Sequence, residues 1–170
     1  MTEAMHAARI NDILSRLQET SVRFTSRLES AGDRAEHAVT GWTPAQIAAH
    51  VAMVNHNLAA VIEGSRPAAA PPAADFRERD WADVVRDVPA KNEAPARFQP
   101  PAQVASAEAI AQFRDSVAHL ARAIAALPSD RARYCIHNRV VGTITLYQAG
   151  DFAIAHMIRH NQQLKRVLGG

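Results

Sequence analysis

Two histidines four residues apart near the C-terminus have the spacing that points most directly to chemistry. His156 and His160 lie in the segment 145–167, which reads TLYQAGDFAIAHMIRHNQQLKRV. Residues four apart on a helix are neighbours on one face, so two neutral imidazoles at this spacing can bind one metal ion. Met157 stands where zinc proteases with an HExxH motif carry their glutamate, so that chemistry is not offered. A hydrogen-bonded structural role is the alternative that the pair alone leaves open.

The segment that carries this pair has the pattern of an amphipathic helix. Thr145 and Gln148 form a capping-box sequence at its start. At about 100° per residue, one stripe of the helix combines apolar residues with both histidines: Ala149, Phe152, Ala153, His156, His160, Gln163, Leu164 and Val167. The two imidazoles therefore lie in the face that should be buried, where their nitrogens need partners.

A third ligand is expected from a second helix. A capping box with proline at the first helical position predicts where that helix starts, at Thr43, Pro44 and Gln46. His50 lies at the edge of the apolar face of this helix, whereas His56 lies on the opposite side. His50 is therefore the candidate third ligand, and His56 is expected at the surface. Asn57 shares the stripe of His50 and is a candidate hydrogen-bond partner for a ligand.

The elements that must position these residues are four long helices, predicted over 2–30, 43–64, 106–127 and 145–167. Ser106 is the expected N-cap of the third helix. Residues 65–105 are rich in proline and alanine and are too long for an ordinary turn. Within them, residues 80–85 are expected to form a helical turn that packs Trp81 onto the bundle or acts as a lid over a site. Residues 133–144 favour a short hairpin.

This pattern predicts an all-α fold, a four-helix bundle with a long crossover between helices two and three, forming one domain over 1–170. The crossover lets helices two and three run parallel, so helices two and four run antiparallel. His50 then lies roughly 9 Å from one end of its helix, and the C-terminal pair lies roughly 15 Å from the matching end of its own. These two positions along the bundle axis are close enough to permit a three-histidine site.

Composition limits the classes of function. The chain has 170 residues, 48% of them hydrophobic, with 19 Lys and Arg against 17 Asp and Glu. The net charge of +2 and the lack of a basic tract argue against nucleic-acid binding. No long apolar run predicts a membrane span or a signal peptide, so a soluble, cytoplasmic protein is expected. The single cysteine, Cys135, cannot form an internal disulfide.

Several further residues have two interpretations each. Cys135 is expected to be a small buried side chain rather than a nucleophile or ligand. His137 either lines the mouth of the site or is an ordinary loop histidine. His119 is expected to be exposed. Trp42 and Phe152 are expected to pack in the core rather than to stack on a substrate.

Two stretches together resemble the DinB-like superfamily of metal-binding helical bundles. They are WTPxQIxxH at 42–50 and TL-x9-HxxxHxxQL at 145–164, separated by the long middle connection. The resemblance covers nearly the whole chain through helix order, although only these stretches carry specific motifs. It implies an up-down-down-up bundle, a homodimer, and a divalent ion, commonly zinc or nickel, bound by His50, His156 and His160. It also implies that Gln163 orients a ligand.

The resemblance also implies an activity. Family members of known activity are S-transferases or isomerases that use bacillithiol, mycothiol or glutathione with a small-molecule substrate. An ion on three neutral histidines can activate a low-molecular-weight thiol for transfer to an electrophile, or metal-bound water for hydrolysis. Asp151 points away from the histidine stripe and Glu63 is far along helix two, so no general base is evident. A zinc-bound thiolate needs none, which favours thiol transfer.

A second hypothesis belongs to another class of protein. It is a non-catalytic, metal-stabilised bundle that acts as a stress-related binding or interaction protein. Structural zinc sites normally have four protein ligands, so an open coordination position separates the two hypotheses. If His137 or Cys135 closed the site, the structural role would gain support.

Overall fold

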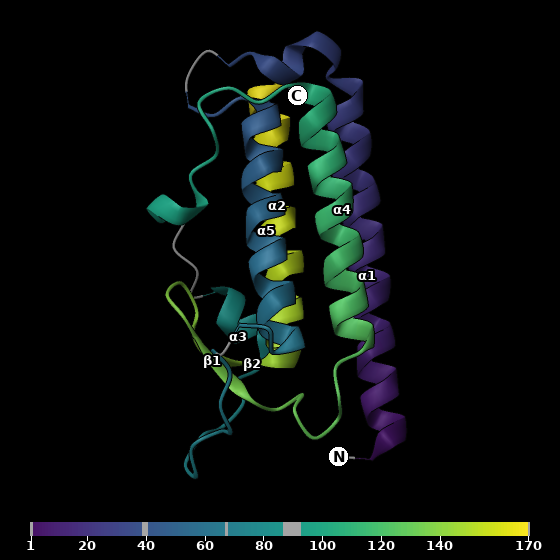
Figure 1. Cartoon of the computed structure of the whole chain (residues 1–170), viewed down its shortest axis with the longest axis vertical. Coiled ribbons are helices and arrows are strands. Elements are labelled where there is room, and N and C mark those ends of the chain that lie inside the picture. Colours follow the sequence, from purple (N-terminus) through teal and green to yellow (C-terminus); the bar gives the residue numbers. More distant parts are fainter. Residues whose placement is uncertain (1, 39–40, 67, 87–92, 170) are drawn as a thin grey trace.

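The computed structural model describes residues 2–38, 41–66, 68–86 and 93–169, in which four long helices pack side by side (Figure 1). They are α1 (Glu3–Ser30), α2 (Pro44–Glu63), α4 (Ser106–Ala125) and α5 (Leu146–Val167). An antiparallel hairpin of β1 (Cys135–Asn138) and β2 (Gly142–Thr145) precedes α5, with Ile136 opposite Ile144. The prediction of a mainly helical chain with four long helices and a short hairpin is confirmed.

The starts of α2 and α5 are fixed by the two predicted capping boxes. The Thr43 hydroxyl accepts a hydrogen bond from the Gln46 backbone N–H at 3.1 Å, and the Gln46 side chain accepts one from the Thr43 backbone at 3.0 Å. Thr145 and Gln148 make the same reciprocal pair at the start of α5. Because these contacts fix where each helix begins, they also fix which face each later histidine occupies.

The start of α4 differs from the prediction. Ser106 is the first residue of this helix, and its N-cap is Ala105, which has no side-chain oxygen to offer. The Glu36 carboxylate accepts the Ser106 backbone N–H at 2.7 Å instead. Glu36 ends the short 3₁₀ helix η1 (Gly32–Glu36), so a distant segment caps this helix, which local sequence cannot reveal.

The core is shared by all four helices, and α2 is buried most completely. Its apolar residues pack between α4 and α5. Gly64 ends α2 with a left-handed φ of 83°, as its position in the sequence predicts. Among the residues that the structure describes, no helix combines the length and apolar character needed to cross a membrane.

The long connection after α2 returns to the bundle at several points. A two-residue backbone bridge joins Ala70 to Cys135 at the hairpin. The short helix α3 (Trp81–Arg86) packs against α5 with Val84 buried and Trp81 half-buried against the core, so the predicted helical turn and its packing are confirmed. Trp81 also lines the groove described below, so the alternative role as a lid stays a prediction. A second 3₁₀ helix, η2 (Ala96–Phe98), follows before α4.

At Gly150, side chains of α1 and α4 lie close to the backbone of α5. A Cβ atom there would lie 3.0 Å from Cγ2 of Ile13 on α1 and 3.4 Å from Cδ1 of Ile124 on α4. We predict that Gly150→Ala lowers the free energy of unfolding by about 1 kcal/mol, because overpacking outweighs the gain in helix propensity. Urea denaturation measures the change.

The matched test of this contact uses Ile13→Leu, which moves the branch away from the Cβ position. The penalty of Gly150→Ala should shrink in the Ile13→Leu background, because the two side chains no longer collide. Equal penalties in both backgrounds would show that the predicted collision with Ile13 does not limit the approach of the helices.

Candidate metal centre

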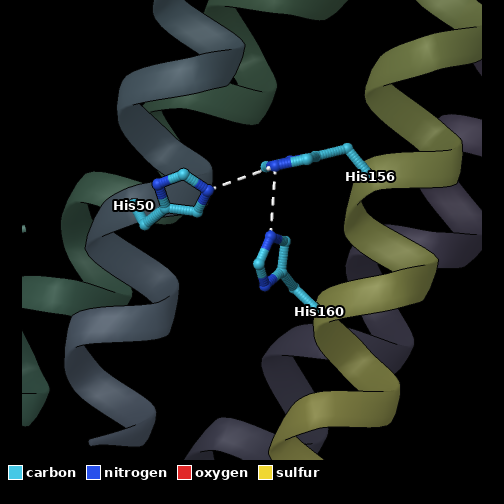
Figure 2. A group of neighbouring side chains, drawn as sticks. All are labelled: His50, His156 and His160. Atoms are coloured by element: carbon cyan, nitrogen blue, oxygen red, sulfur yellow. Dashed lines mark hydrogen bonds between the residues drawn. The ribbon is translucent and has the colours of Figure 1, made fainter. Parts of the chain in front are cut away.

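Three histidines from two helices point at one another near the middle of the bundle (Figure 2). His50 comes from α2, and His156 and His160 come from successive turns of α5. The Nε2 atom of His156 lies 3.2 Å from Nε2 of His50 and 3.1 Å from Nε2 of His160. The facing nitrogens of all three lie within 4.8 Å of one another. The structure therefore brings together the three residues that the sequence singled out.

Two of these rings have their outer nitrogen held by a carbonyl oxygen. Nδ1 of His50 donates to the backbone oxygen of Phe98 at 2.7 Å, and Nδ1 of His160 donates to Oε1 of Gln163 at 2.8 Å. A carbonyl oxygen can only accept, so in each neutral ring the proton sits on Nδ1. The Nε2 atoms of both rings therefore present lone pairs to the centre of the cluster.

His156 cannot satisfy both of these lone pairs by itself. One proton on its Nε2 can serve one neighbouring acceptor well and leaves the other facing a nitrogen. The Nδ1 atom of His156 is buried and has no hydrogen-bond partner within the described part of the chain, so no acceptor there fixes the proton of this ring. A cation at the centre would satisfy all three Nε2 atoms together, so the donor set fits a metal ion.

The two shorter nitrogen–nitrogen distances, 3.2 Å and 3.1 Å, agree with this fit. Two imidazole nitrogens each 2.0–2.1 Å from a tetrahedral ion are about 3.3 Å apart. The rings of His156 and His160 have centroids 4.4 Å apart with their nitrogens 3.1 Å apart, so their lone pairs meet at an angle rather than end on. Convergent lone pairs are the arrangement that one shared ion requires.

A second pair of histidines provides a contrast. Nδ1 of His56 lies 2.9 Å from Nδ1 of His119, but the ring centroids are 5.2 Å apart, so these nitrogens face each other nearly end on. Nε2 of His119 donates to Glu63 at 3.0 Å, which leaves its Nδ1 as the acceptor of the His56 Nδ1–H. This geometry suits a shared proton and not a metal ion.

The same pair corrects two predictions. The sequence pattern predicts His56 and His119 at the surface, but both are half-buried and join α2 to α4. The helical pattern places each residue correctly on the outer side of its own helix. The helical pattern carries no information on the neighbouring helix. The outer sides of α2 and α4 face the same interface, where the two histidines meet.

The environment keeps the three clustered histidines neutral. Burial lowers the pKa of His50, and the hydrogen bond to Phe98 opposes that shift only in part. Burial, followed by the charge of His50, lowers the pKa of His160 to about 4. The pKa of His156 falls well below its usual value through burial and then through His160, His50 and Arg159. Neutral imidazole is the form that binds metals.

The cluster opens into a groove of about 1570 Å³ between α1, α2, α5, the hairpin and the long connection. Trp42 packs against the His50 ring at 4.9 Å and Phe152 stacks against His156 at 5.9 Å, measured between centroids. Both residues touch the core as predicted, but they also line the groove beside the histidines. His137 lines the groove too and lies outside the cluster, which matches the first of its two interpretations.

Other residues that the sequence singled out lie away from the cluster. Asn57 is seven residues beyond His50, about 10 Å along the helix axis, and its side chain accepts a hydrogen bond from Arg66. The shared stripe was correct, but the axial distance is too long for a ligand contact. Asp151 is buried and paired with Arg16 on α1 at 2.5 Å. Burial raises the pKa of the Cys135 thiol, so this residue is not an activated nucleophile.

The contact that sequence reasoning missed is the carbonyl of Phe98. It belongs to η2, inside the long connection, and fixes the proton of His50. Every residue has a backbone oxygen, so the amino-acid types of an irregular segment do not reveal which oxygen accepts a hydrogen bond from a histidine. The predicted partner Gln163 had a signal, because three residues on a helix place it next to His160.

Comparison with known proteins agrees with this geometry. The model of the DinB superfamily matches residues 5–164 of the chain. The protein therefore belongs to the DinB superfamily, and its histidine cluster is compatible with the metal binding known for that fold. A search of curated proteins gives no match.

The lowered pKa values generate a prediction about pH. The unfolded chain takes up protons on its histidines below about pH 6.5, whereas the folded metal-free protein resists this, His160 down to a pKa of about 4. The unfolded state then binds more protons, so stability falls as the pH falls from about 6.5 toward 4. Each such histidine contributes a slope of about 1.4 kcal/mol per pH unit.

Urea denaturation of the metal-free protein at about pH 7 and about pH 5 measures this slope. His160→Gln is the matched variant, since glutamine is polar but does not titrate, and its slope should be smaller. Equal slopes for the variant and the wild type would contradict the pKa shift at His160.

Proposed function

We propose that the protein binds one divalent metal ion through His50, His156 and His160 and uses it as an enzyme on a small-molecule substrate. The observation that carries the proposal is the convergence of three Nε2 atoms, two of which belong to rings whose outer N–H group is held by a carbonyl oxygen. Imidazole sets of this kind suit zinc, nickel and neighbouring ions, and we propose zinc or nickel here.

The number of ligands supports an enzyme over a structural site. Neither Cys135 nor His137 joins the three histidines among the described residues, so the protein supplies three ligands and not four. Structural zinc sites are normally closed by four protein ligands, whereas catalytic sites keep a position for substrate or water. The groove reaches the cluster and gives a substrate access to that position.

The chemistry that such an ion supplies is Lewis-acid activation, which lowers the pKa of a bound thiol or water. The residues of the chain do the rest. Phe98 and Gln163 hold the proton of their histidine partners on Nδ1. Trp42 and Phe152 cover the imidazole rings and limit the access of water.

Thiol activation is the reaction that the surrounding residues favour. Asp151 is held by Arg16, and Glu63 accepts a hydrogen bond from His119 far from the cluster. Thus neither carboxylate is placed as a general base. Activation of a low-molecular-weight thiol for S-transfer to an electrophile needs no separate base, whereas hydrolysis usually does. Hydrolysis stays as the close variant of this proposal.

The assembly and setting of the protein belong to the same proposal. We infer an up-down-down-up bundle, as the resemblance implies, and a homodimer in the cytoplasm. The alternative function is a non-catalytic bundle in which the metal stabilises a surface for a stress-related partner. That alternative draws its support from the lack of a placed acid or base.

Metal content tests the proposal first. Protein purified without a histidine tag should carry about one equivalent of zinc or nickel by elemental mass spectrometry. His156→Ala/His160→Ala should lose it, because two of three ligands are gone. His137→Ala is the matched control, since this exposed histidine lines the groove outside the cluster. Absence of metal from the wild type after reconstitution would overturn both metal-dependent functions.

The metal-loaded protein then separates the enzyme from the alternative. Bacillithiol, mycothiol and glutathione are each supplied with an electrophile, and thiol consumption is followed with wild type and with the double histidine variant. Metal-dependent consumption supports the enzyme. A metal that raises the melting temperature while no thiol is bound or consumed favours the non-catalytic bundle.

Gln163 provides a finer test of the centre. Its Oε1 is the acceptor for Nδ1–H of His160, so Gln163→Leu should weaken metal binding by about 10- to 100-fold. Gln163→Glu restores an acceptor and should recover most of the affinity. Gln162→Leu is the matched control, because its side chain is exposed. Competition with a chelator of known affinity measures the constants, and equal values for Gln163→Leu and Gln162→Leu would contradict the orienting role.

A further inference from the structure

The groove that leads to the histidine cluster carries more positive charge than the chain as a whole. Six arginines line it, namely Arg16, Arg23, Arg97, Arg139, Arg159 and Arg166. Its acidic residues are Glu19, Glu93 and Asp151, so the lining has an excess of three positive charges. The entire chain has a net charge of only +2. Positive charge is therefore concentrated at the groove.

Part of this charge is neutralised inside the protein. Arg16 pairs with Asp151 at 2.5 Å and with Asp12 at 2.8 Å. Arg23 lies 3.7 Å from Glu19. These contacts account for two of the six arginines and two of the three acids. They stabilise the wall of the groove and leave little charge there for a ligand.

Three of the other four arginines have no ion-pair partner in the part of the chain that the structure describes. Arg97, Arg139 and Arg166 form no ion pair with any acidic residue in the described ranges, and all three are exposed. They come from η2, from the turn of the hairpin and from the end of α5. Their charges act along the whole groove, whose walls focus the field on a molecule inside it.

Arg97 is the arginine closest in the chain to the residue that holds His50. It precedes Phe98, whose carbonyl takes the Nδ1–H of His50, and its guanidinium lies over the Phe98 ring at 4.8 Å from the centroid. This stacking orients the planar donor group of Arg97 within the lining of the groove. Arg159 precedes His160 on α5 and lines the same groove.

We propose that the groove takes a small molecule bearing a carboxylate or phosphate group, with the guanidinium of Arg97 as its principal anchor beside the histidine cluster. This deepens the proposed function and rests on it for the identity of the site. A guanidinium binds either group through two parallel hydrogen bonds, which gives both affinity and orientation. The apolar wall of Trp42 and Phe152 packs against the rest of the molecule.

The charge of the groove also ranks the thiols that the family resemblance implies. Glutathione and bacillithiol carry free carboxylates, whereas mycothiol is an uncharged sugar thiol apart from its sulfur. A groove with unpaired arginines favours the carboxylate-bearing thiols. The same chemistry would equally hold an anionic electrophile, so the test must separate recognition of the anion from bonding of sulfur to the metal.

The experiment is calorimetric titration of the full-length protein, metal-loaded and at two salt concentrations. The probes are glutathione, S-methylglutathione and 2-mercaptoethanol. S-methylglutathione keeps the carboxylates and blocks the thiol, whereas 2-mercaptoethanol keeps the thiol and has no anion. Arg97→Gln should raise the dissociation constants of both glutathione compounds about tenfold, through loss of a charge-assisted hydrogen bond, and leave 2-mercaptoethanol unchanged. High salt should weaken the binding of the same two compounds.

Two variants serve as controls. Arg122→Gln removes the same charge from an exposed position on α4 outside the groove, so it should bind like wild type. Arg97→Lys keeps the charge but lacks the bidentate donor, so it should recover binding in part. A far-ultraviolet circular dichroism spectrum equal to wild type establishes that each variant is folded.

The metal-free double variant His156→Ala/His160→Ala separates the two proposals. If S-methylglutathione binds it and binding still depends on Arg97, the anion site stands even where the metal proposal fails. If S-methylglutathione does not bind the metal-loaded wild type, or binds it equally after Arg97→Gln, the anion site is overturned. In that case metal-dependent binding of 2-mercaptoethanol would leave the proposed function intact.

Discussion

Three imidazole Nε2 atoms directed at one small volume are the constraint on which the rest of the structure depends. Facing acceptors repel, and burial removes the water that would otherwise separate them. Carbonyl oxygens hold the protons of His50 and His160 on the outer side, so rotation of a ring cannot relieve the repulsion without breaking a hydrogen bond. The hydrogen-bond pattern of the site therefore favours a cation at its centre.

That pattern explains why the irregular connection is part of the site. The bundle alone supplies the three rings, but it supplies an outer acceptor only to His160, through Gln163 on the same helix. The acceptor for His50 comes from outside α2. The helix uses its own carbonyls internally, and Met53 and Val54, three and four residues on, have no side-chain oxygen. η2 provides that acceptor, and the contacts of α3 with α5 and of Ala70 with Cys135 tie the same connection to the bundle. The connection therefore orients a ligand as well as covering the core.

The sequence could predict those features of the fold and the site that depend on a single helix. Capping boxes set the first residues of α2 and α5, and helical periodicity then put His50, His156, His160 and Gln163 on the right faces. What it could not predict were contacts between elements. Glu36 capping α4, Phe98 holding His50 and the pairing of His56 with His119 all join segments more than forty residues apart. The prediction that Asn57 contacts a ligand did not hold for a related reason. Helical periodicity gives the direction of a side chain around the helix axis, but contact with a ligand also depends on the position of the residue along that axis.

The His56–His119 pair and the histidine cluster show that the number of neighbouring histidines does not by itself identify a metal site. Both bring imidazole nitrogens to about the same separation, 2.9 Å in one case and 3.1–3.2 Å in the other. In the first, the rings meet end on and Glu63 stabilises a protonated Nε2 on the far side, so a proton fills the gap. In the second, the rings converge at an angle and three Nε2 atoms share one volume, where a single proton cannot serve both His50 and His160. The direction of the lone pairs, and not the number of histidines, decides that one cluster joins two helices while the other is suited to a metal ion.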